Sequence, residues 1–169
     1  MKKGAALVNM LLKRQDKLSL IALDNVMRVA IPFNAPHGFS FKKITDEEVQ
    51  ISLPNFKLNH NHLSGMHACA IATLGEFCAG MTLVKHFGMT QYRYILSELS
   101  VKYHLQGRTG LVGIAKLDSE RVASIKEQLT QQEKVLVDHN TEIMNRHGEK
   151  IADVRTVWQM KDWNKVQLK

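Results

Sequence analysis

The sequence predicts an α+β fold in which one curved antiparallel sheet wraps around a single long helix. The segment 65–86 (GMHACAIATLGEFCAGMTLVKH) is apolar nearly all round, which is typical of a helix buried on every side. The second half of the chain consists mostly of segments in which apolar and polar residues alternate, as they do in half-buried strands. One enclosed helix followed by many strands favours a sheet folded around that helix.

The chain length favours a single domain. Its 169 residues are enough to bury one sizeable core and too few to make two cores expected. Within a single domain spanning 1–169 we expect a helical extension over 1–36, a core over 37–161 and a polar tail over 162–169.

The N-terminal part predicts one helix and one strand. Apolar residues recur at three- and four-residue steps from about Ala5 to Ala30, and Pro32 and Pro36 then end the helix. This helix either packs on the edge of the core, which is the favoured interpretation, or forms a lid over a ligand pocket. Alternation between apolar and polar residues then predicts a strand over about Phe39–Leu53.

The buried helix is rich in small residues, which let neighbouring backbone approach closely. Its glycines cost helix stability, so tight packing has to compensate. After this helix the pattern predicts four strands, with a short helical or irregular connection over 118–130. The strands are expected at Tyr92–Leu105, Leu111–Leu117, Lys134–Asn145 and Lys150–Met160.

The net charge of +7 favours anionic partners, but Lys and Arg are scattered and form no basic stripe with interleaved aromatics. Nucleic acid is therefore not an expected partner. No apolar run reaches the length that we expect of a membrane span. Cys69 and Cys78 are expected to be small core residues in a reducing compartment, and the chain is expected to be cytoplasmic.

Glu76 is the first candidate for chemistry, because it is the only charged residue between Gly65 and Val84. A carboxylate on an apolar helix loses hydration, which raises its pKa and costs stability unless the group has a use. The alternative is that the helix has one wetted edge, where Glu76 is simply solvated.

The start of the same helix is the second candidate. Free backbone N–H groups at a helix start suit a carbonyl oxygen that gains negative charge during acyl transfer, and the small residues Gly65 and Ala68 would let a ligand approach them. The preceding loop contains His60 and His62, but its spacing matches no standard zinc pattern, so no metal is expected. Glycine-rich nucleotide motifs and a nucleophile elbow are absent from the sequence.

The segment Asn61–Phe77 (NHLSGMHACAIATLGEF) resembles the signature of hot-dog thioesterases of the phenylacetyl-CoA type. In that signature an Asn, a Gly and His-Gly-Gly open the central helix, and an acidic residue follows within it. The wider frame, with Ile-Pro-Phe-Asn at 31–34 and Leu-Pro-Asn at 53–55, resembles an uncharacterised bacterial hot-dog family more closely still. This second resemblance covers nearly the whole chain.

The resemblance implies a hot-dog fold, with homodimers or homotetramers and a site at the dimer interface. It implies that Glu76 is the general base or nucleophile and that the N–H of Ala68, beside Gly65, polarises the thioester carbonyl. It assigns Asn61, from the neighbouring subunit, to water or substrate, and His67 to the leaving group or loop. Two features depart from the family pattern: His67-Ala68-Cys69 replaces His-Gly-Gly, and the acid is Glu where Asp is common.

The same resemblance suggests further substrate contacts. A polar residue on the strand after the helix often assists, and Ser97 or Ser100 could fill that place. Coenzyme A carries phosphates that Arg108, Lys102 or Lys85 could meet. Coenzyme A enters here as part of the substrate, and no separate cofactor or metal is expected.

Three hypotheses follow from the sequence. The first is a thioesterase that hydrolyses acyl groups carried on coenzyme A or on acyl carrier protein. The second is a non-catalytic acyl- or lipid-binding module that uses the same site. The third is a structural oligomer in which Glu76 only pairs across the interface.

Overall fold

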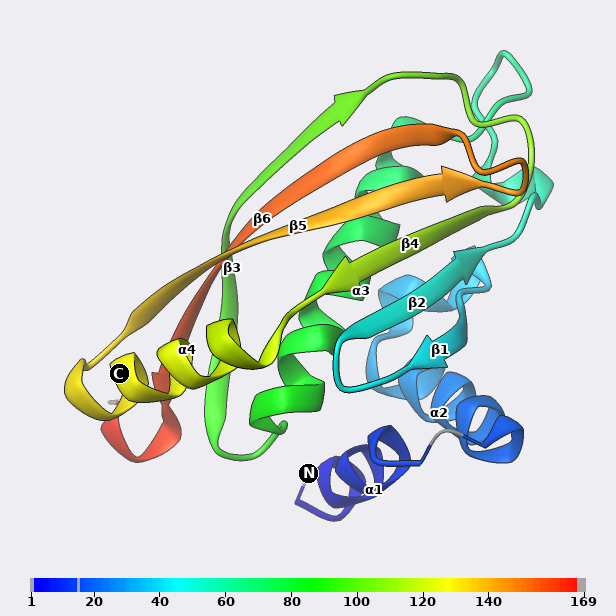
Figure 1. Cartoon of the computed structure of the whole chain (residues 1–169). Coiled ribbons are helices and arrows are strands. Elements are labelled where there is room, and N and C mark those ends of the chain that lie inside the picture. Colours follow the sequence, from blue (N-terminus) through cyan, green and yellow to red (C-terminus); the bar gives the residue numbers. More distant parts are fainter. Residues whose placement is uncertain (1, 15, 167–169) are drawn as a thin grey trace.

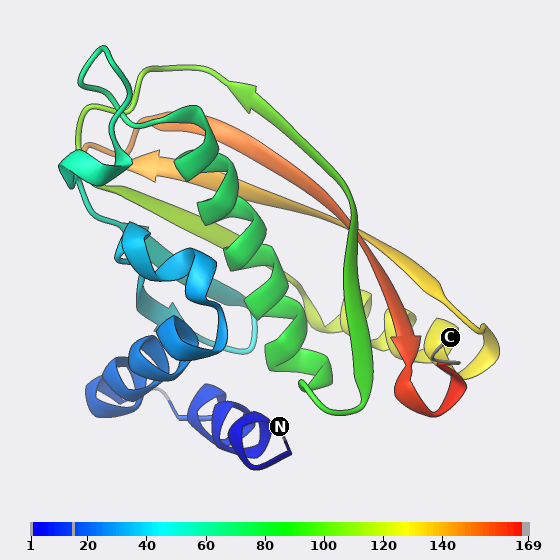
Figure 2. The ribbon, with the colours of Figure 1, turned by 180° about the vertical axis from the view of Figure 1, so that it is seen from behind.

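A curved six-stranded antiparallel sheet wraps around one long helix in the computed structural model, which describes residues 2–14 and 16–166. The strands lie in the order β1-β2-β4-β5-β6-β3. Helix α3 (Ala68–Phe87) crosses the concave face of this sheet, and the two N-terminal helices lie beside the β1 edge (Figures 1 and 2). The predicted α+β architecture is confirmed.

The N-terminal extension contains two helices, so the prediction of one helix over Ala5–Ala30 was wrong. The helices are α1 (Lys2–Leu12) and α2 (Lys17–Ala30). Asp16 separates them, because its carboxylate accepts hydrogen bonds from the backbone N–H and the hydroxyl of Ser19, at 2.9 and 2.7 Å. This is the N-cap arrangement that starts a new helix. Leu23 and Met27 of α2 are buried in the main core, so the extension packs against the domain.

The first strand segment is a hairpin, so the single strand predicted over Phe39–Leu53 was also wrong. It consists of β1 (Ser40–Ile44) and β2 (Glu48–Leu53). Thr45 makes the turn: its N–H donates to the Glu48 carbonyl at 2.8 Å, and its hydroxyl accepts from the Glu48 N–H at 3.1 Å. Residues 45–47 lack the alternation of their neighbours, which was the available signal.

The remaining strands agree with prediction to within one or two residues at their ends. They are β3 (Tyr92–Tyr103), β4 (Leu111–Lys116), β5 (Val135–Asn145) and β6 (Lys150–Asp162). The connection over 118–130 forms a regular helix, α4 (Ser119–Gln131), which Asp118 caps. Beyond the last strand a short turn covers Trp163–Lys165, and the end of the expected tail, 167–169, lies outside the described residues.

Small residues seat α3 on the sheet, as the sequence predicted. A Cβ at Gly75 would lie only 2.4 Å from the Val154 Cβ, so no side chain fits there. The buried thiol of Cys78 donates to the carbonyls of Val49 on β2 and Gly113 on β4. Cys69, by contrast, is exposed, so the expectation that both cysteines lie in the core was wrong for this one.

Helix α3 is long and apolar enough, by length and composition, to cross a membrane. Most of it is nevertheless buried inside the domain, where it forms the centre of the core (Figure 2). A core helix of a protein passes the same test of length and composition, so this segment is explained by packing against the sheet.

Candidate active site at the start of the central helix

Helix α3 begins at Ala68, where His67 provides the N-cap. The His67 Nδ1 accepts a hydrogen bond from the backbone N–H of Cys69 at 3.1 Å. No described residue accepts a hydrogen bond from the N–H of Ala68. The helix start therefore presents an available donor, reinforced by the positive end of the helix dipole.

Asn59, which is almost fully buried, anchors the loop before α3. Its side-chain nitrogen donates to the backbone carbonyls of His37 and Pro54, at 3.0 and 3.1 Å, and its backbone carbonyl accepts from the His67 N–H at 2.7 Å. These bonds tie the loop to the N-terminal extension and fix the position of the His67 cap.

Asn61 shapes the tip of the same loop. Its side-chain oxygen accepts from the N–H groups of Leu63 and Gly65, at 2.9 and 3.2 Å, and Ser64 between them has a positive φ of 59°. Since the oxygen is committed to the turn, the amide NH₂ of Asn61 is the part of the side chain left for a ligand.

A cavity of about 290 Å³ lies in front of the helix start. Its walls come from the loop before α3, from the first turn of α3, and from the end of β3 with the loop that follows it. The residues that line it are Asn61, Met66, Ala68, Ile71, Tyr103, His104, Leu105, Gln106 and Gly107. Its lining combines apolar side chains with the polar side chains of Asn61, Tyr103, His104 and Gln106.

The end of β3 is attached directly to the helix start. The Tyr103 hydroxyl donates to the carbonyl of Ala68 at 2.9 Å, and burial raises the pKa of this phenol. The next residue, His104, pairs with the Asp153 carboxylate at 2.7 Å. These contacts hold one wall of the cavity against the first turn of α3.

Gln106 fills the space that a side chain at position 65 would need. A Cβ on Gly65 would lie 2.7 Å from the Gln106 Nε2. Arg108 holds the other end of the same amide, because its Nε and Nη2 donate to the Gln106 Oε1 at 3.0 and 2.8 Å. Gly65, expected to be a substrate contact, is buried against Gln106 and is not among the residues that line the cavity.

Glu76 lies elsewhere on α3. It is two residues from Cys78, so it points to roughly the opposite side of the helix from the sheet, about 200° around the axis. The side chain is half-buried, and burial raises the pKa of its carboxyl group. No described residue forms a hydrogen bond or an ion pair with it. Eight residues separate it from Ala68, about 12 Å along the helix, and it does not line the cavity.

The two serines proposed as substrate contacts lie away from the cavity. Ser97 forms a bulge in β3, and its hydroxyl donates to the Val157 carbonyl at 2.9 Å. Ser100 is opposite Arg155, whose exposed side chain points away from α3, and strand pairing puts Ser100 on that same outer face. Neither residue lines the cavity.

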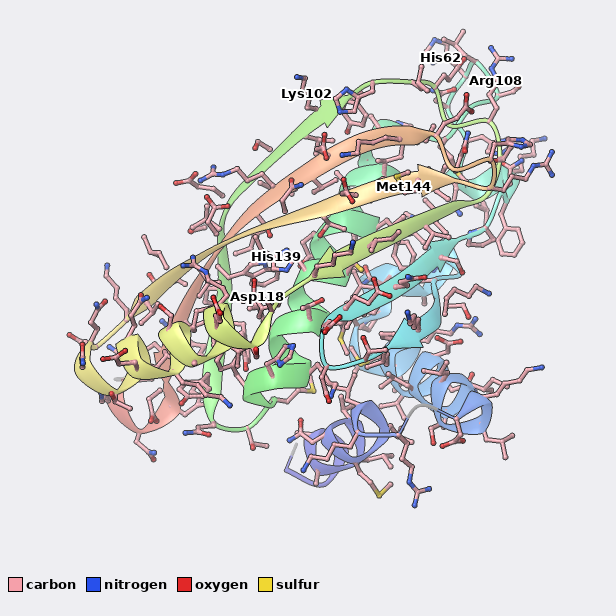
Figure 3. All side chains as sticks on the ribbon, in the orientation of Figure 1. His62, Lys102, Arg108, Asp118, His139 and Met144 are labelled. Carbon is pink, nitrogen blue, oxygen red and sulfur yellow. The ribbon has the colours of Figure 1, made fainter. Side chains whose placement is uncertain are left out.

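His62 and Arg108 lie at the end of the molecule where α3 begins, and both are exposed (Figure 3). His60 is tied to the Asn55 side chain at 2.7 Å. Among residues 2–14 and 16–166, no group of three or more His, Cys, Asp and Glu residues is arranged to hold a metal ion.

Comparison with known proteins gives the family. Residues 21–160 match the profile of a domain of unknown function, DUF4442. The chain belongs to the DUF4442 family. This match agrees with the resemblance to an uncharacterised bacterial hot-dog family, and it covers most of α2 and nearly all of the sheet. No curated protein matches the chain.

Solved structures similar to this DUF4442 protein share its fold. A Pseudomonas aeruginosa protein of unknown function, described as a probable thioesterase, is 20% identical with a TM-score of 0.76, over 82% of this chain and 93% of that one. A Staphylococcus aureus thioesterase is 15% identical with a TM-score of 0.64, over 77% and 98%. A Haemophilus influenzae thioesterase is 8% identical with a TM-score of 0.67, over 88% and 94%. The fold is therefore the hot-dog fold.

Sequence reasoning missed Tyr103 and Gln106. Tyr103 reads as an ordinary member of an alternating strand, and Gln106 as part of a polar turn. Their roles depend on contacts with Ala68 and Gly65, which are distant in the sequence, so no local pattern could have indicated them. The one available signal was Gly65 itself, because a glycine without positive φ marks a close approach by another group.

Proposed function

We propose that this protein is a cytoplasmic hydrolase of acyl thioesters carried on coenzyme A or acyl carrier protein. The observation that carries the proposal is Glu76, a half-buried carboxylate without a partner among the described residues, whose pKa is raised by burial. An unpaired acid on the central helix costs folding stability, so a catalytic use is its best explanation. A raised pKa also brings a carboxylate closer to the working pH of a general base.

The proposed site needs two copies of the chain. Glu76 and the cavity occupy different stretches of α3, about 12 Å apart along its axis, so one copy cannot bring both to one bond. The edge strand β3 is twelve residues long and pairs only with β6 among the described strands. Leu99 and Tyr103 on its inner face are exposed. Such an edge is suited to a second copy, and we propose that each Glu76 faces the partner's helix start.

In this site the Ala68 N–H donates a hydrogen bond to the thioester carbonyl oxygen. Glu76 takes a proton from water, and the resulting hydroxide attacks the carbonyl carbon. The tetrahedral intermediate collapses, the carbon–sulfur bond breaks, and the thiolate takes up the proton that Glu76 accepted. The products are a carboxylic acid and a free thiol. The Ala68 N–H stabilises the charge that develops on oxygen.

Two solved structures of the Staphylococcus aureus protein support the same pair of positions. One carries an alanine in place of a glutamine and the other an alanine in place of a glutamate fifteen positions later. Asn61 and Glu76 are separated by the same number of positions in this chain. This equal spacing supports their assignment to the proposed site.

The test is hydrolysis of a panel of acyl-CoA thioesters by the wild type and by Glu76→Gln. Loss of a general base is expected to lower kcat/KM by at least about 100-fold. In the wild type, kcat/KM should rise with pH as Glu76 loses its proton. Glu47→Gln, an equal change at an exposed turn, is the control and should leave the rate unchanged.

Thermal unfolding separates catalysis from folding in the same variants. Removing the half-buried charge is expected to stabilise Glu76→Gln at pH 8 by about 1 kcal/mol, as often occurs when a functional acid is removed. Full hydrolysis by Glu76→Gln would overturn the proposal.

A non-catalytic acyl-binding module is the second candidate. It is favoured by Ala68 and the exposed Cys69, which stand where the signature of the phenylacetyl-CoA-type thioesterases has two glycines and narrow the approach to the helix start. Binding of acyl-CoA without turnover would support this candidate, and neither binding nor turnover would leave a structural oligomer.

A further inference from the structure

Two side-chain amides line the cavity, and in both of them the oxygen, but not the NH₂, is already used by described residues. The side-chain oxygen of Asn61 is used by two backbone N–H groups of its own loop. The side-chain oxygen of Gln106 is used by two donors of the Arg108 guanidinium. Both amide NH₂ groups remain, and both residues line the cavity together with Ala68, whose N–H is also free of described partners.

The two amides meet at one residue. Asn61 accepts from the Gly65 N–H, and the Gln106 Nε2 lies 2.7 Å from the position that a Cβ at residue 65 would take. Both amides are therefore placed by contacts with Gly65. The Gly107 carbonyl, the next acceptor in this wall, already receives the Met66 N–H at 2.7 Å.

We propose that Gln106 donates through Nε2 to the carbonyl oxygen of the acyl thioester, and that Arg108 is the positioning residue that fixes the orientation of this amide. This rests on the proposed function, which supplies the thioester. An amide can present either its oxygen or its NH₂. The guanidinium carries donors only, so it holds the oxygen on its own side and aims the NH₂ at the ligand.

This assignment changes the role expected for Arg108. Two of its nitrogens bind Gln106, and the contact stays within the loop between β3 and β4. Its contribution to binding is then mainly to the acyl carbonyl, through Gln106, and less to the phosphates of coenzyme A.

The decisive variant is Gln106→Glu, which keeps the shape of the side chain and its contact with Arg108 but replaces the NH₂ donor with an acceptor. Its matched control is Gln132→Glu, the same change at the exposed end of α4. Two octanoyl-CoA analogues serve as probes: a ketone in which CH₂ replaces the thioester sulfur, and a thioether in which CH₂ replaces the carbonyl.

The wild type and the Gln132→Glu control are expected to bind the ketone about tenfold more tightly than the thioether, the worth of roughly one good hydrogen bond. In Gln106→Glu this preference should disappear, because the carboxylate repels the carbonyl oxygen and offsets its hydrogen bond with the Ala68 N–H, while the affinity for the thioether stays the same. Arg108→Met should reduce the preference partly, because the amide can then turn over. A purely structural role for Gln106 would weaken both probes equally.

Retention of the carbonyl preference in Gln106→Glu would overturn the inference, as would equal weakening of both probes. If Glu76→Gln abolishes hydrolysis while Gln106→Glu hydrolyses at the wild-type rate, the proposed function stands and the role of Gln106 falls. If the wild type neither hydrolyses octanoyl-CoA nor binds either probe, both proposals fall together.

Discussion

The two ends of α3 differ in how they are surrounded. At the C-terminal end, Leu83 and Phe87 are buried in a second core cluster with Val122 and Ile125 of α4. At the N-terminal end, residues 67–69 are exposed beside an open cavity. One continuous helix therefore has a closed end, which holds the fold together, and an open end, which is available to a ligand.

This difference suggests that stability and chemistry are divided along the helix. Buried apolar contacts at the closed end supply folding free energy. At the open end, hydrogen bonds such as those of Asn59 and Tyr103 hold the exposed residues 67–69 and the wall of the cavity in place. Substitutions at the two ends should therefore have different kinds of effect.

The largest effect is expected from Leu83→Ala at the closed end. Leu83 is fully buried, and its truncation leaves a cavity among α3, α4 and the sheet, which typically costs about 3 kcal/mol. Cys69→Ala at the exposed end is the matched comparison and should cost less than about 0.5 kcal/mol. Urea unfolding measures both, and equal costs would show that the proposed division of the helix is wrong.

The next effect concerns pH and is expected from His139 on β5, which lies between the sheet and the helices (Figure 3). Neither ring nitrogen has a hydrogen-bond partner among the described residues, and burial lowers the pKa of this histidine to about 4. Between about pH 6.5 and pH 4 the unfolded chain therefore binds a proton at His139 that the folded chain does not bind. Stability is complete above about pH 6.5 and falls as the pH drops toward 4, by up to about 3 kcal/mol.

Replacing His139 with Phe tests this pH dependence. The variant should lose most of the fall in unfolding free energy between pH 6.5 and pH 4.5. His147→Gln, in the exposed turn between β5 and β6, should keep it. If His139→Phe loses stability on acidification as steeply as the wild type, another group is responsible.

Much of the fold could be predicted because it follows from periodicity. The all-round apolar character of residues 65–86 required an enclosing sheet, and alternation located the four later strands. The errors occurred where the hydrogen bonds of a single polar residue determine the direction of the backbone. Asp16 ends one helix run and starts another, and Thr45 turns one strand back on itself. The polar residues at 13–17 and 45–47 do interrupt the apolar pattern, but the pattern resumes after each of them, so both interruptions are compatible with irregularities within one element.

The candidate site was predictable only in part, for a related reason. Asn61, His67 and Ala68 are close in sequence, so one motif captures them together. Gln106 and Tyr103 reach the same place through the return of β3, which depends on the tertiary fold. Local sequence determines the helix start, whereas the opposite wall of the cavity depends on strand pairing.

The smallest effect is expected from Ser100→Ala. This variant tests whether a residue on β3 near the open end affects hydrolysis when its side chain is on the outer face of the sheet. Ser100 is three residues before Tyr103, but strand pairing turns it to the outer face, opposite Arg155. Its hydroxyl is exposed, so its loss should change the unfolding free energy by less than about 0.5 kcal/mol and the rate by less than about twofold. Tyr103→Phe, on the inner face, removes the bond to Ala68 and should lower the rate several-fold more than Ser100→Ala does. A rate loss in Ser100→Ala equal to that in Tyr103→Phe would mean that the outer face of β3 also meets the ligand.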